Sequence, residues 1–231
     1  MKKLTLICLM LSFAVITFAQ KDFGGVIKLK TYAEGTTDPN ILSQSQSEYE
    51  ETVLGSLTKI VASQGGIGTI VIRDGNTGIM NVILDLSAMA YGKYLVSDTL
   101  NLKLIQFDYE YDETDTREIA GYKCKKAVVT IIDLETDDSE IRNLYVTDDL
   151  MNPKTYKSYD YPGLKGYPLY TAVEVDNAGE KYTIIVEASE ITPSKKVKPI
   201  DFLLPAGWKP IQNAPESVKA MFGLGGEEDE E

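Results

Sequence analysis

Residues 116–133 have the sequence TREIAGYKCKKAVVTIID, and this stretch decides the fold that the sequence predicts. A short half-polar run ends at Ala120, Gly121 interrupts it, and residues 122–132 form a longer run rich in β-branched and aromatic residues, which favour strands. A glycine between two strand-like runs is typical of a kink or bulge, because glycine tolerates a positive φ. Lysines lie on both faces at the start of the longer run and apolar residues on both faces later. We therefore predict a strand that begins at a solvated rim and runs into a covered centre.

The N-terminus predicts export. Two lysines precede an apolar run over residues 4–18, and Thr17 and Ala19 supply the small residues of a cleavage site. The run is shorter than the roughly 20 residues of a membrane-spanning helix. Cys8 lies inside this run without a small residue before it, so we expect no lipid anchor. We predict a signal peptide at residues 1–19, no transmembrane segment after cleavage, and a periplasmic or secreted mature protein.

The composition is acidic. The 231-residue chain has a formal net charge of −12, and loss of a signal peptide with two lysines and no acid leaves −14 on the remaining 212 residues. This charge disfavours binding to nucleic acid and to anionic membrane surfaces. The length of residues 20–222 suits one β-rich domain, and residues 223–231, with five acids, are expected to form a disordered tail.

The sequence disfavours catalysis. It contains no histidine, which removes the usual general base, the commonest zinc ligand and every Ser-His or Cys-His arrangement. Cys124 is the only cysteine after processing, so no intramolecular disulfide can form, and we expect it to be a small buried residue. No G-x-S-x-G motif frames a nucleophile. We expect no catalytic residue, no metal and no cofactor.

One longer helix is predicted at residues 47–62. Ser47 and Glu50 have the spacing of a capping box, and apolar residues then repeat at helical spacing until two glycines follow. Two interpretations are open for this helix: a lid over a cavity, or a cover for the core.

Most other segments predict strands, through alternating or β-branched runs separated by turn residues. The expected strands are residues 23–32, 68–73, 79–86, 91–96, 100–111, 140–147, 169–175, 181–191 and 201–204. We expect a loop at residues 35–46, a helical turn at Asp148 and Asp149, and a short amphipathic helix at residues 215–222.

Two groups of side chains could form a binding site, one for calcium and one for an organic ligand. Asp108, Glu110 and Asp112 share one strand face, but they lack the spacing of a dedicated calcium loop, so we expect a solvated surface. Five tyrosines lie between Tyr156 and Tyr170. They either line a ligand groove or form the packed edge of the sheet. Pro168, at the start of the expected strand, favours the edge.

Several motifs resemble one family. They are EIAGYKCKK at residues 118–126, YVTDDL at 145–150, LKGYPL at 164–169 and FLLPAGWK at 202–209. Their order over the last two thirds of the mature chain resembles a family of secreted bacterial proteins known only as a domain of unknown function. That family is similar to the periplasmic lipoprotein-carrier (LolA/LolB-like) half-barrels. The resemblance implies a half-barrel and no established catalytic residues.

The predicted fold is mainly β (α+β), a curved antiparallel sheet or half-barrel with one longer helix and short C-terminal helices against it. A curved sheet with an apolar concave face must be filled by its own helices or by a guest. We therefore expect a non-catalytic periplasmic binding or carrier-like protein for an apolar or amphipathic ligand, such as a lipid or acyl chain. The alternative is an envelope protein-interaction or chaperone-like module that binds a protein or peptide. The expected ligand-binding residues are Met80, Val82, Leu84, Phe107, Tyr109, Tyr167, Tyr170 and Trp208.

Overall fold

The computed structural model describes residues 22–64, 66–177 and 179–222, so the predicted signal peptide and acidic tail lie outside the described residues. The fold is mainly β, as predicted. The strands are β1 (Gly24–Glu34), β2 (Ser47–Leu54), β3 (Leu57–Gln64), β4 (Ile67–Asp74), β5 (Ile79–Asp85), β6 (Lys93–Thr99), β7 (Ile105–Ile119), β8 (Tyr122–Asp133), β9 (Ser139–Thr147), β10 (Tyr167–Asn177), β11 (Glu180–Pro193) and β12 (Trp208–Pro210). The helices are α1 (Pro39–Ser45), α2 (Glu216–Met221) and three short 3₁₀ segments, η1 (Ser87–Met89), η2 (Pro199–Phe202) and η3 (Ile211–Asn213).

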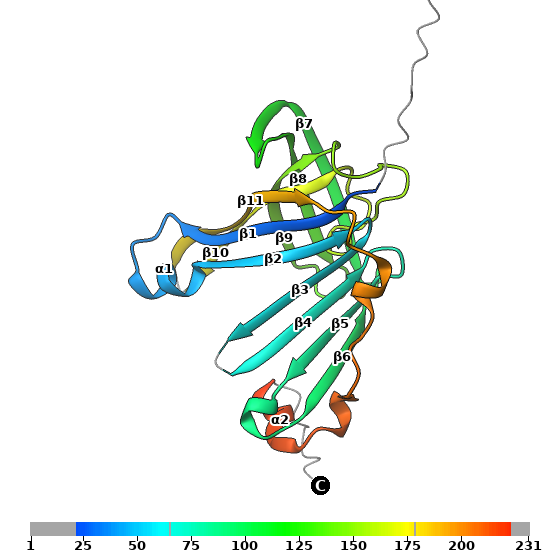
Figure 1. Cartoon of the computed structure of the whole chain (residues 1–231). Coiled ribbons are helices and arrows are strands. Elements are labelled where there is room, and N and C mark those ends of the chain that lie inside the picture. The colour runs from blue at the N-terminus through cyan, green and yellow to red at the C-terminus, as the bar shows by residue number, and fades with distance from the viewer. Residues whose placement is uncertain (1–21, 65, 178, 223–231) are drawn as a thin grey trace, which may run out of the picture.

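All twelve strands form one open sheet in the order β12-β6-β5-β4-β3-β2-β1-β11-β10-β9-β8-β7. Neighbours are antiparallel except β12, which runs parallel to β6. Figure 1 shows a strong bend, with β3 to β6 fanning away from the strands around β1 and β11. The bend gives the sheet an inner face, which we define as the face covered by residues 148–166.

Residues 116–133 supply the end of β7, the turn that follows it and the whole of β8, at one end of the sheet. Ala120 and Gly121 have φ angles of 48° and 83° and connect the paired residues Ile119 and Tyr122. The predicted kink or bulge at Gly121 is therefore wrong: the glycine serves a tight turn, which needs positive φ at both positions. The irregularity in pairing lies instead between Asp112 and Thr116 on β7. Cys124 is buried in β8, as predicted.

The predicted helix at residues 47–62 is wrong, because this segment forms the β2–β3 hairpin. Strand β2 pairs with β1 along its whole length, and Gly55, with a φ of 57°, lies in the turn. Tyr49 and Glu51 share one strand face, an alternation that the helical spacing of other apolar residues concealed. Tertiary pairing with β1 outweighs the local capping signal here.

Three shorter predictions also need correction. The loop at residues 35–46 contains α1, where Asp38 caps the helix by accepting a hydrogen bond of 2.8 Å from the Asn40 N–H. The strand predicted at residues 201–204 is η2, which a proline and the Asp201 cap favour, and the closing strand is β12. Bends replace the helical turn predicted after Asp148. The hairpins β4–β5 and β10–β11, strand β9 and helix α2 match the prediction.

The chain itself covers both ends of the inner face. At the β7–β9 end, Tyr161 and Leu164 from residues 148–166 pack on buried side chains of β8 and β9. At the β5–β6 end, Ile211, Ala214 and Val218 cover a second cluster, Leu84, Leu86 and Tyr94, and Figure 1 shows α2 at this end. The predicted cover by short C-terminal helices is confirmed. The candidate functional site lies between these two covered ends.

Candidate functional site

A pocket of about 290 Å³ lies on the inner face, beneath residues 156–161. Strands β1 to β4 supply one wall and β9 to β11 another. The pocket is rich in aromatic and aliphatic side chains, with six tyrosines in its lining: Tyr49, Tyr156, Tyr159, Tyr161, Tyr167 and Tyr170. Tyrosine offers a large apolar body with a polar tip, so this lining suits an amphipathic molecule.

Two tight turns hold residues 156–161 over the sheet. The Lys157 N–H donates to the Ser56 hydroxyl at 2.8 Å, and the Gly75 N–H donates to the Ser56 carbonyl at 3.0 Å. Gly75 lies so close to Lys157 that a Cβ built on it would be 1.9 Å from the Lys157 carbonyl oxygen. Ser158 then accepts from the Tyr161 N–H at 3.1 Å. The β2–β3 and β4–β5 turns therefore fix the segment that roofs the pocket.

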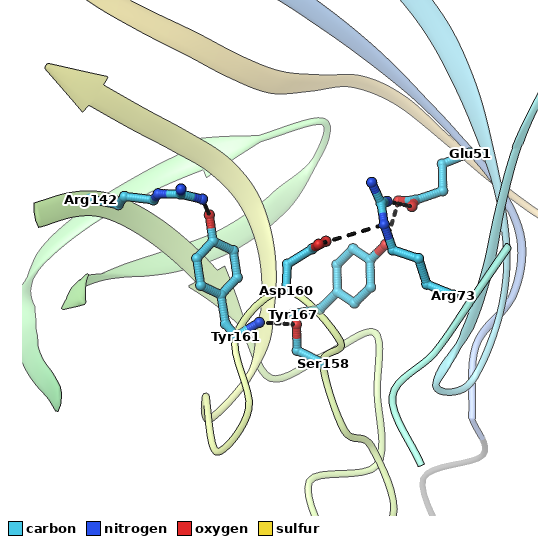
Figure 2. A network of polar contacts seen from close by, with 7 residues as sticks. All are labelled: Glu51, Arg73, Arg142, Ser158, Asp160, Tyr161 and Tyr167. Atoms are coloured by element: carbon cyan, nitrogen blue, oxygen red, sulfur yellow. Dashed lines mark hydrogen bonds and ion pairs between the residues drawn. The ribbon is translucent and has the colours of Figure 1, made fainter. Parts of the chain in front are cut away.

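A charged group lies inside the pocket (Figure 2). Arg73 Nη1 is 3.6 Å from Glu51 Oε1, and Arg73 Nε is 3.6 Å from Asp160 Oδ1. The Tyr167 hydroxyl donates to Glu51 Oε2 at 3.1 Å. Glu51 comes from β2, Arg73 from β4, Tyr167 from β10 and Asp160 from the roof. The fold thus brings strand β2 and residues 160–167 together around the guanidinium on β4.

Burial governs the protonation of this group. It raises the pKa of the Glu51 carboxyl, and nearby Asp160 acts in the same direction, while Arg73 and the hydrogen bond from Tyr167 act against it. Burial and the adjacent Glu51 raise the pKa of Tyr167 well above its usual range. Burial also raises the pKa of Tyr49 to about 12. The hydroxyls of Tyr49 and Tyr167 therefore remain neutral donors at physiological pH.

A second arginine in the lining is fully engaged. Arg142 holds Glu140 through two hydrogen bonds of 2.8 and 2.9 Å, which raise the pKa of its guanidinium. Its Nη1 donates to the Tyr161 hydroxyl at 3.4 Å. Figure 2 shows this pair on the opposite side of the roof from Arg73. Arg142 therefore supports the roof.

The structure brings together two of the residues predicted to bind a ligand, Tyr167 and Tyr170. Met80, Val82 and Leu84 lie on β5, where Leu84 is buried under the C-terminal segment. Phe107 and Tyr109 lie on β7 and pack under residues 148–166.

The Tyr109 hydroxyl donates to the Pro162 carbonyl at 3.0 Å. Trp208 lies on the edge strand β12, paired with Lys93.

The tyrosine cluster does not form an edge of the sheet. Strand β10 lies between β11 and β9, so the edge interpretation is wrong. Pro168 instead marks a register shift, where a ladder position without an N–H is tolerated. Sequence reasoning missed Tyr49, Glu51 and Arg73. The alternation in β2 was the available signal for the first two.

No family model matches the sequence, and no curated protein matches it. A solved structure that matches is a DUF1329 family protein from Desulfovibrio piger, with 6% identity, a TM-score of 0.23, and 80% of this chain and 91% of that chain covered. Within the described residues, no helix is long and apolar enough to span a bilayer, and no group of three His, Cys, Asp or Glu side chains is placed to hold a metal.

Proposed function

We propose that this protein is a non-catalytic binding or carrier-like protein of the periplasm for an amphipathic ligand with one apolar chain or ring. The observation that carries the proposal is the tyrosine-lined pocket on the inner face of the bent sheet. Binding sites for small molecules are concave, mostly apolar and supplied with a few fixed polar groups. Residues 118–126 and three later motifs resemble a family of secreted bacterial proteins of unknown function, and the similarity of that family to LolA/LolB-like carriers supports the same function.

The size of the pocket restricts the ligand. Its volume of about 290 Å³ is at the lower end of the roughly 300–1,000 Å³ of small-molecule sites. The chain's own residues cover the inner face on both sides of it. A molecule with one short acyl chain or one aromatic ring therefore fits better than a lipid with several chains.

A ligand screen tests this function. The exported protein is melted with single-chain acids, alcohols, lysolipids and apolar peptides, and native mass spectrometry of protein from the periplasm identifies what co-purifies. A ligand that binds only the folded state raises the melting temperature by mass action.

Val173→Trp, which fills the pocket, should remove the response. Ile141→Trp, on an exposed position of β9, should retain it. A shift that survives Val173→Trp, or no shift with any single-chain compound, would contradict the proposal.

The alternative is a protein-binding envelope module, and one surface favours it. Val61 on β3 and Ile200 and Leu203 at η2 are exposed by 61%, 69% and 65%. The Lys59 ammonium donates to the Asp201 carbonyl at 2.9 Å, which joins η2 to β3. Exposed aliphatic side chains on two elements that are joined in this way suit a contact surface. A melting shift with peptides or envelope extract alone would favour this function.

A further inference from the structure

Arg73 makes only long ion pairs with the neighbouring acids, and its Nε has no hydrogen-bond partner among the described residues. Both of its ion pairs are 3.6 Å long, whereas charge-assisted N–H···O bonds are about 2.7–2.9 Å. Its Nε is buried and makes no hydrogen bond with any described residue. Arg142, in the same pocket, reaches Glu140 at 2.8 and 2.9 Å. The contrast shows that Arg73 retains hydrogen-bonding capacity inside the pocket.

A guanidinium whose Nε is buried and unsatisfied favours an anionic acceptor. Its planar set of N–H donors matches a carboxylate or phosphate through two parallel hydrogen bonds. Leaving such donors unpaired in a buried place costs free energy, which an acceptor in the pocket would recover.

The neighbouring acids limit the charge of that acceptor. Glu51 and Asp160 already lie at the guanidinium, so a doubly charged phosphate would meet like charges on both sides. A singly charged carboxylate meets less repulsion. Asp160 is half-exposed on the roof, whereas Glu51 is buried and accepts a hydrogen bond from Tyr167. A bound anion can therefore displace Asp160 from Arg73 more easily than it can displace Glu51.

We propose that the pocket takes a monocarboxylate with one apolar chain or ring, whose carboxylate binds Arg73 in place of Asp160 while the apolar body lies among the tyrosines. This inference rests on the proposed function, because it assigns the head group of the same ligand class. It makes Arg73 the residue that selects acids over neutral compounds of equal length.

The test compares decanoate with 1-decanol by isothermal titration calorimetry at pH 7.5, using the exported protein. The two probes share a ten-carbon chain and differ in the head group. Charge-assisted hydrogen bonds predict that decanoate binds at least about tenfold more tightly than decanol. Asp160→Asn removes the competing acid and should increase this preference.

Removal of Arg73 is tested in a form that leaves no unpaired buried charge. The double variant Glu51→Gln/Arg73→Gln removes both members of the ion pair and should bind the two probes equally. Glu51→Gln alone should keep the preference for decanoate. Lys28→Gln is the control, because it removes a cation that is paired with Glu190 outside the pocket, and it should also keep the preference.

The outcomes separate the two proposals. If wild-type protein binds decanol and decanoate equally, or if the preference persists without Arg73, the inference about the head group is wrong and the binding function stands. If wild-type protein binds neither probe, the proposed function fails and the inference fails with it. A preference that disappears only in the double variant supports both.

Discussion

Gly75→Ala is expected to destabilise the protein by releasing the roof of the pocket. The ideal Cβ at residue 75 is 1.9 Å from the Lys157 carbonyl oxygen, and such contacts below 3.0 Å require a shift of the backbone. The β4–β5 turn and the roof must therefore move apart by more than about 1 Å. Overpacking costs about 1–3 kcal/mol, and weakening the two hydrogen bonds at Ser56 adds about 1 kcal/mol, so we expect a loss of about 2–4 kcal/mol.

The matched control for this change is Gly92→Ala. A Cβ at residue 92 meets nothing within 4 Å, so the same substitution introduces no clash there. We expect its effect to lie between about 0 and 1 kcal/mol of stabilisation, through reduced freedom of the unfolded chain. Urea denaturation of both variants measures the difference. Equal stability of Gly75→Ala and Gly92→Ala would refute the close packing of the roof on the β4–β5 turn.

Four further predictions follow from the described contacts and the sequence. Burial raises the pKa of the Glu51 carboxyl, so the folded state holds its proton more tightly than the unfolded state does. As the pH rises above about 4.5, the free energy of unfolding should therefore fall by up to about 1.4 kcal/mol per pH unit relative to that of Glu51→Gln. Parallel pH profiles of the two proteins would contradict this. Cys124 is 1% exposed and burial raises its pKa to about 11, so a thiol reagent should label it slowly in buffer and rapidly in denaturant; fast native labelling would indicate an accessible thiol. Leu84→Asp places a charge under the C-terminal segment and should cost several kcal/mol in thermal unfolding, whereas a near-native melting temperature would show that this cover is loose. The intact mass of the exported protein should match a chain that begins after Ala19, and a lipid-modified mass would exclude the predicted processing.

The sequence predicts the structure well where two paired strands are neighbours along the chain. The hairpin β4–β5 follows from alternating runs around Asp74 and Gly75, and β10–β11 follows in the same way. The burial of Cys124 follows from its place in a strand that runs into apolar residues. These features depend on side-chain period and turn chemistry, which neighbouring residues encode.

The site was only partly predictable for a physical reason. The density of tyrosine in residues 156–170 points to Tyr167 and Tyr170. Glu51 lies in a segment whose sequence pattern predicts a helix, and Arg73 carries no local signal, so the sequence does not reveal either residue. The two are joined only through the pairing of β2 with β3 and of β3 with β4.

Local sequence patterns are enough to predict the mainly β class and several hairpins. The tertiary structure decided which acids reach Arg73 and which apolar residues the chain covers. Leu84 is an example: the alternation of its strand marks an apolar face whether or not that face is covered. Only the packing of Val218 and its neighbours shows that the chain itself covers Leu84. Alternation fixes which face a side chain occupies, and sheet curvature with long-range strand pairing fixes what lies opposite that face.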